Sequence, residues 1–89
     1  MRLNVYLSVQ AEKFLAHLGK TNEKLYQLIK SHLLHLPEVY KGDPFLKGPD
    51  CRGVRRHRVG DYRILYRVIQ ERLIIYVIGI GHRRDVYDR

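Results

Sequence analysis

The spacing of the apolar residues constrains the fold of this chain most, because it changes from a helical period to a strand period near residue 52. Apolar residues between 9 and 36 recur three or four positions apart, whereas those between 54 and 80 mostly alternate with polar ones. A chain of 89 residues has material for one hydrophobic core. We therefore predict a single α+β domain over residues 1–89, in which an N-terminal strand and a helical hairpin pack on a small, mostly antiparallel sheet.

The first part of the chain predicts a strand followed by two helices. Residues 2–8 alternate apolar and polar side chains, which indicates a short strand, and Ser8 can cap the next helix. Gly19 is expected to end that helix, Thr21 to cap a second one, and Pro37 to end the second. The buried stripe of the second helix is expected to comprise Leu25, Leu28, Ile29, Leu33 and Leu36.

The second part of the chain predicts a three-stranded meander. Residues 37–50 contain prolines and glycines, which favour a loop. Strands are expected over residues 54–58, 62–69 and 72–80, joined by two-residue turns at 60–61 and 70–71.

Turn length sets the register of the strands and therefore the position of each arginine. A two-residue first turn places Arg58 opposite Arg63 and brings Arg56 to the same face. A two-residue second turn places Arg63 opposite Ile78. Like charges opposite each other are destabilising, so we interpret this cluster as functional, the alternative being that the side chains splay apart into water. The chain after the last strand is expected to bring further polar side chains toward the arginines, namely His82, Arg83, Arg84 and Tyr87.

The two faces of the predicted sheet differ in character. The helices should cover the face that carries Tyr62, Ile64, Tyr66, Val68, Leu73, Ile75 and Val77. The arginine face also carries Ile69, Ile74, Tyr76, Ile78 and Ile80. This is more apolar surface than a small soluble monomer usually exposes, so a partner protein is expected there or on the helices.

The charge of the chain points to a polyanionic partner. The net charge is +8, and residues 51–89 hold ten basic residues, all arginine, against four acidic ones. The planar guanidinium matches phosphate with two hydrogen bonds. A cationic site with no acidic pair, metal cluster or glycine-rich phosphate loop suits phosphodiester transfer on RNA, in which the 2′-hydroxyl attacks the neighbouring phosphate.

The sequence lacks the features of disulfide-bonded, zinc-binding, membrane-spanning and secreted proteins. The single cysteine, Cys51, cannot form an internal disulfide, and no Cys or His cluster has zinc spacing. The longest apolar run is far shorter than the roughly 20 residues of a membrane span, and the start lacks the pattern of a secretory signal. We expect a cytoplasmic protein that needs no metal or other cofactor.

Two segments resemble the RelE branch of the RelE/ParE toxin superfamily, and the resemblance extends over the whole chain. These segments are RHRVGDYRILY at residues 56–66 and VIGIGHRRDVY at residues 77–87. The resemblance implies the toxin of a type II toxin–antitoxin system. RelE-like toxins cut mRNA in the ribosomal A site without a metal ion, leaving a 2′,3′-cyclic phosphate and a 5′-hydroxyl.

The resemblance also implies roles for individual residues. By position, Arg63 corresponds to the arginine that contacts the scissile phosphate, Arg83 to the proposed general acid and Tyr87 to the proposed general base. Arg56 falls where the family often has a catalytic lysine. A second family lysine falls on Val54, or on Arg55 if the strand bulges. The expected RNA-binding residues are Arg55, Arg58, His82 and Arg84, of which Arg58 and His82 come from the register rather than from the resemblance.

The resemblance also implies binding partners, and two alternative functions stay open. The implied partners are the ribosome, its mRNA and an acidic, partly disordered, RelB-like antitoxin. One alternative is a ParE-like toxin, which shares the fold but inhibits DNA gyrase and cuts no RNA. Another is a basic nucleic-acid-binding module without catalytic activity.

Overall fold

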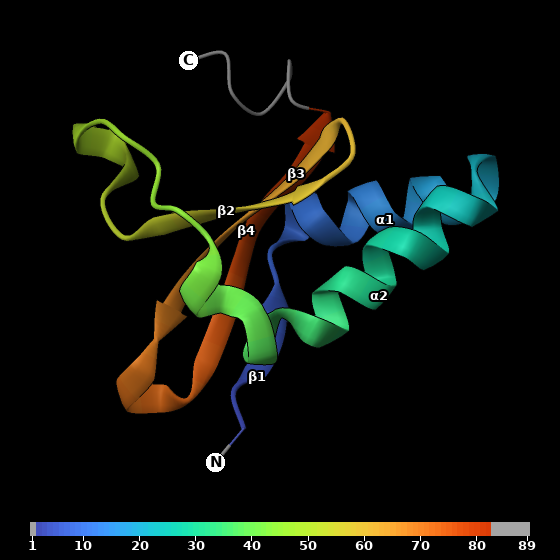
Figure 1. Cartoon of the computed structure of the whole chain (residues 1–89). Coiled ribbons are helices and arrows are strands. Elements are labelled where there is room, and N and C mark those ends of the chain that lie inside the picture. The colour runs from blue at the N-terminus through green and yellow to red at the C-terminus, as the bar shows by residue number, and fades with distance from the viewer. Residues whose placement is uncertain (1, 83–89) are drawn as a thin grey trace.

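A computed structural model describes residues 2–82 and confirms the α+β fold (Figure 1). In chain order the elements are β1 (Asn4–Leu7), α1 (Val9–Thr21), α2 (Glu23–Val39), β2 (Val54–Val59), β3 (Tyr62–Ile69) and β4 (Ile74–His82). Short 3₁₀ helices occupy Tyr40–Gly42, Pro49–Cys51 and Gln70–Arg72. None of the helices in the described range is long and apolar enough to span a membrane.

The four strands form one sheet in the order β1-β4-β3-β2. The pairs β2–β3 and β3–β4 are antiparallel, whereas β1 runs parallel to β4. Both helices lie on the same side of the sheet, with α1 against β4 and α2 against β1 (Figure 1). Among the described residues no helix covers the opposite side.

The core lies between the helices and this side of the sheet. The helices contribute fully or nearly fully buried side chains from Ala11, Leu15, Leu18, Ile29, Leu33 and Leu36. The sheet contributes Ile64, Tyr66, Ile75, Val77 and Ile80, each with no exposed area. Four of these five sheet residues are among those that alternation predicted for the helix-covered face. The exception is Ile80.

The start of α1 agrees with the sequence, but the junction between the helices differs from it. Ser8 caps α1 by accepting a hydrogen bond from the Ala11 N–H at 3.1 Å. Gly19 does not end α1, which continues to Thr21. Thr21 does not cap α2, because its hydroxyl donates back to a carbonyl one turn earlier in α1. The single residue Asn22 instead terminates α1 and caps α2.

Helix α2 also differs from the prediction at two positions. It continues through Pro37 to Val39, because a proline in the last turn removes only one backbone hydrogen bond. The Tyr40 N–H still bonds to the Leu36 carbonyl. Leu28 is 49% exposed and lies outside the buried stripe, which is therefore narrower than predicted.

The first hairpin has the predicted register. Val59 pairs with Tyr62 across a two-residue turn, and Arg58 pairs with Arg63. Gly60 has a φ of 60°, a left-handed conformation that favours glycine, so this turn is determined locally.

The second hairpin does not have the predicted register. Ile69 pairs with Ile74, so the connection has four residues, and Leu73 adopts a left-handed conformation with a φ of 55°. A bulge in β4 then shifts the pairing between Leu65 and Tyr66 by one residue. As a result Arg63 lies opposite Gly81, not Ile78.

The same bulge changes the face on which the end of β4 packs. Ile80 pairs with Ile64 and is fully buried in the core, so the prediction that it lies on the arginine face is wrong. The side chain of Gln10, near the start of α1, holds this part of β4. Its amide accepts from the Ile80 N–H and donates to the Ile80 carbonyl, both at 3.0 Å.

Candidate active site

Arginine side chains from two adjacent strands gather on the side of the sheet that faces away from the helices. Arg56 and Arg58 lie two residues apart on β2, and Arg63 pairs directly with Arg58. Arg67 follows on the same face of β3, because side chains four residues apart in a strand point the same way. We call the surface that carries these four residues the arginine face.

Arg63 differs from its neighbours in burial. Its side chain is 5% exposed, whereas Arg58 and Arg67 are exposed. The Arg63 guanidinium donates to the carbonyls of Gly60 and Tyr62, each at 3.1 Å. The tight turn therefore orients this charge, which is the preorganisation that stabilisation of a developing anion requires.

The structure brings together Arg56, Arg58 and Arg63 but separates two other predicted site residues from them. Arg55 pairs with Tyr66 without a bulge in β2, so it lies on the helix side. There its guanidinium stacks 4.0 Å from the centre of the Phe45 ring. His82 pairs with Tyr62 and packs edge-on against its ring, at 5.4 Å between ring centres, instead of joining the arginines.

Three predicted site residues lie outside the described residues. These are Arg83, expected as general acid, Tyr87, expected as general base, and Arg84, expected to bind RNA. Their roles remain predictions.

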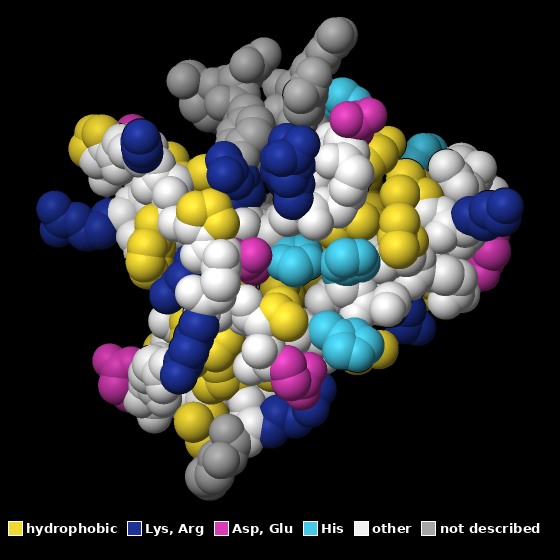
Figure 2. All heavy atoms as spheres, in the orientation of Figure 1, with side chains coloured by type: hydrophobic (Ala, Val, Ile, Leu, Met, Phe, Trp, Pro, Cys, Tyr) yellow, Lys and Arg dark blue, Asp and Glu magenta, His cyan; other side chains and the backbone are white. Residues whose placement is uncertain are grey.

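A hydrogen-bonded chain of titratable residues on the helix side was not predicted from the sequence. The Asp43 carboxylate accepts from the Tyr66 hydroxyl at 2.6 Å and from Nδ1 of His57 at 2.8 Å. Nε2 of His57 lies 2.8 Å from Nδ1 of His32 on α2. Figure 2 shows histidine side chains gathered at the centre of this view, next to an acidic side chain. Strand alternation could have placed His57 on this side, but no spacing pattern connects it with Asp43 or His32.

The hydrogen bonds that link Asp43, His57 and His32 limit how many protons these three side chains can hold together. His57 donates through Nδ1 to Asp43, so in its neutral form its Nε2 must accept a hydrogen bond from the Nδ1–H of His32. One added proton is compatible with every hydrogen bond. A second added proton would place N–H groups on both facing nitrogens and break the His32–His57 contact. Burial keeps the Tyr66 hydroxyl protonated by raising its pKa, and the Asp43 carboxylate that accepts its hydrogen bond adds to that effect.

We expect the free energy of unfolding to decrease as the pH falls below about 6.5, partly because of His32. Burial, followed by the charges of His57 and His35, lowers the pKa of His32 from its ordinary value of 6.5. The unfolded chain then binds the proton first, so stability is present above the unfolded pKa and is lost as the pH falls toward the folded pKa. The slope from one such group is at most about 1.4 kcal/mol per pH unit.

Chemical denaturation at pH 7.5 and 5.5 measures this effect. His32→Gln, which can still donate to His57 but cannot be protonated, should lose less stability between these pH values than the parent protein. His17→Gln, a change at an exposed histidine of α1, is the matched control and should follow the parent. Equal losses in the parent and His32→Gln would contradict the assignment.

The Asp43 segment also holds strand β2 in place. The Asp43 carbonyl accepts from Arg55 at 2.7 Å, and the Pro44 carbonyl accepts from the Arg56 N–H at 3.0 Å. The Leu46 N–H donates to the Val54 carbonyl at 2.8 Å. These bonds satisfy the outer edge of β2 and fix the strand that carries Arg56 and Arg58.

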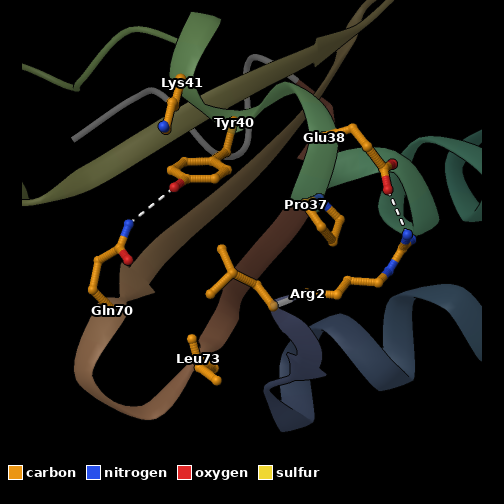
Figure 3. Close-up of a pocket in the computed structure, with 8 residues that line it drawn as sticks. Arg2, Pro37, Glu38, Tyr40, Lys41, Gln70 and Leu73 are labelled. Carbon is orange, nitrogen blue, oxygen red and sulfur yellow. Dashed lines mark hydrogen bonds and ion pairs between the residues drawn. The ribbon is translucent and has the colours of Figure 1, made fainter.

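A separate pocket of about 470 Å³ lies at the other end of β3 from Arg63 (Figure 3). Its polar contacts are an ion pair between Arg2 and Glu38 and a hydrogen bond from Gln70 to the Tyr40 hydroxyl at 2.9 Å. None of these groups belongs to the arginine face. Within residues 2–82 no cluster of three or more His, Cys, Asp or Glu is arranged to hold a metal ion.

Comparison with known families decides the broad identity of the chain. Residues 5–87 match the family described as the ParE toxin of the type II toxin–antitoxin system, parDE. The chain belongs to this toxin family. The resemblance to toxins of the RelE/ParE superfamily is thereby confirmed. No curated protein sequence matches the chain significantly.

Solved structures of related toxins share the fold of this toxin at low sequence identity. The RelBE2 toxin–antitoxin complex of Mycobacterium tuberculosis contains a chain that is 20% identical, with a TM-score of 0.78 over 93% of this chain and 100% of that one. The E. coli toxin RelE, in a mutant form in the free state, is 22% identical, with a TM-score of 0.73 over 97% of this chain and 88% of that one. The YoeB–YefM complex from Staphylococcus aureus contains a chain that is 20% identical, with a TM-score of 0.71 over 92% and 98% of the two chains.

Proposed function

We propose that this toxin is a ribosome-dependent endoribonuclease that inhibits translation by cutting mRNA in the A site. The observation that carries the proposal is the placement of Arg63, which is buried, oriented by the turn and paired with Arg58. A fixed guanidinium can donate two hydrogen bonds to one phosphate. Such a donor is strongest where the phosphoryl oxygens gain negative charge in the transition state.

The proposed reaction is attack of the RNA 2′-hydroxyl on the adjacent phosphate, with release of the 5′-oxygen. Arg63 stabilises the charge on the phosphoryl oxygens, and Arg56 and Arg58 hold the RNA backbone and neutralise its phosphates. In the proposal Tyr87 removes the 2′-proton and Arg83 supplies a proton to the leaving oxygen, with Arg84 binding RNA. No step uses a metal ion or cofactor.

Mapping of mRNA 5′ ends on translating ribosomes tests the proposal directly. Purified toxin should produce cuts that follow the codon phase, with a cyclic phosphate on the upstream fragment. Naked mRNA in the same buffer reports whether the ribosome is required. Absence of new 5′ ends on ribosome-bound mRNA would refute the nuclease assignment.

Inhibition of DNA gyrase is the second candidate, and the match to the ParE toxin family favours it. In this case the toxin would act through contacts with a protein and cut no RNA. Purified gyrase and supercoiled plasmid distinguish the two, since only a ParE-like toxin should cause gyrase-dependent DNA breaks. A basic module without catalytic activity would give neither mRNA cuts nor gyrase-dependent breaks.

An acidic antitoxin is the proposed partner in either case. The solved structures similar to this chain include toxin–antitoxin complexes, and the arginine face has the charge to attract an acidic segment. We expect the product of the neighbouring open reading frame to co-purify with the toxin and to relieve growth arrest when both are expressed. Expression with an unrelated acidic protein is the control. Failure of the neighbouring product to do either would contradict this pairing.

A further inference from the structure

The side of the sheet that faces away from the helices carries exposed tyrosines as well as the arginines. Tyr6 on β1 pairs with Tyr76 on β4, and both point to this side. Their side chains are 51% and 39% exposed, although they lie on a sheet face where apolar rings would usually be covered. Two exposed aromatic side chains therefore lie on adjacent strands of this face.

This pair of rings is continuous with the arginine face. Tyr76 pairs with Arg67 on β3, so Tyr6, Tyr76 and Arg67 lie in one row across three neighbouring strands. Adjacent strands are about 4.8 Å apart, and successive side chains on one face of a strand are about 6.6 Å apart. Two such steps along the hairpin lead from Arg67 to Arg63 and its partner Arg58. Aromatic rings and cations therefore lie side by side over a distance of a few nucleotides.

We propose that Tyr76 and Tyr6 form a base-stacking platform for the single-stranded RNA whose phosphates contact the arginine face. The inference rests on the proposed nuclease function and extends it to substrate positioning. Single-stranded RNA is held by aromatic side chains that stack on bases and by cations that follow the backbone. A four-stranded sheet that has exposed rings on neighbouring strands, on a face that no helix within residues 2–82 covers, offers both.

The exposure of the individual residues favours RNA over an apolar protein segment as the ligand. The aliphatic residues on this side, such as Ile74 and Ile78, are only partly exposed, whereas both tyrosines are exposed. The large apolar side chains exposed on this side are thus the two tyrosines, and Tyr76 pairs across the sheet with the exposed Arg67. Bases with flat π-faces and phosphates match this combination.

Binding of a 2′-O-methyl single-stranded oligoribonucleotide, which cannot be cleaved, tests the platform by fluorescence anisotropy. Tyr76→Ala should weaken binding about tenfold, within the range measured for loss of one base–aromatic contact. Tyr76→Phe keeps the ring and should bind within about twofold of the parent, whereas Tyr76→Leu should bind as weakly as Tyr76→Ala. Tyr6→Ala should show the same trend. Leu34→Ala removes an exposed side chain from α2 and is the matched control.

The outcomes separate this inference from the proposed function. Ring-dependent binding without A-site cleavage would support the platform and refute the nuclease. A-site cleavage with equal binding by all variants, or with no binding by the parent, would overturn the platform alone. If Tyr76→Ala weakens binding of the antitoxin but leaves RNA binding unchanged, this face is a protein-docking surface and the inference is wrong. Thermal melting of each variant establishes that the fold is retained.

Discussion

Replacement of Arg63 by alanine is expected to lower mRNA cleavage on the ribosome by about a hundredfold. One preorganised donor to a developing anion contributes roughly 2–4 kcal/mol to transition-state stabilisation. Arg63 is the arginine that the turn carbonyls orient and that burial removes from water, so its contribution should exceed that of Arg56 or Arg58. Single-turnover cleavage of ribosome-bound mRNA measures the chemical step directly.

A second substitution of Arg63 shows whether the guanidinium or only its charge is needed. Arg63→Lys keeps the charge but loses the planar pair of donors, so its rate should lie between those of the parent and the alanine variant. Arg72→Ala removes an exposed arginine from the connection at the other end of β3 and should cleave at the parent rate. Arg83→Ala and Tyr87→Phe test the proposed acid and base in the same assay. Cleavage at the parent rate by folded Arg63→Ala would show that the site is wrongly assigned.

Replacement of Asp43 by alanine should lower the free energy of unfolding by about 3 kcal/mol. The carboxylate accepts from the buried Tyr66 hydroxyl and from His57, and hydrogen bonds to a charged group contribute about 1.5–3 kcal/mol each. Its loss also leaves the Tyr66 hydroxyl without this acceptor in a buried position. Urea denaturation at pH 7.5 measures the change.

A double-mutant cycle with Tyr66→Phe isolates the buried hydrogen bond. If the bond is formed, the double variant should lose less stability than the two single variants added together. Asp50→Ala, at an exposed acidic residue, is the control and should change stability by no more than about 0.5 kcal/mol. Strict additivity of Asp43→Ala and Tyr66→Phe would contradict the interaction.

The sequence by itself determined those features that arise from contacts between near neighbours. The change of apolar period specified the helices, the strands and most of the helix-covered face of the sheet. Ser8 marked the start of α1 because its hydroxyl bonds to a backbone N–H only three residues away. Gly60 determined the first turn, and a two-residue turn leaves one register for the strands beside it. Arg58 and Arg63 could therefore be paired before the fold was known.

The tertiary structure decided what depends on contacts between distant residues. A leucine in a left-handed conformation at residue 73 and a bulge in β4 have no local signal, yet they set Gly81 opposite Arg63 and turned Ile80 into the core. The chain of Asp43, His57 and His32 joins a loop, a strand and a helix that only packing brings together. Side-chain orientation at these places follows from the burial of the whole core, because no short segment gains enough free energy to choose it alone.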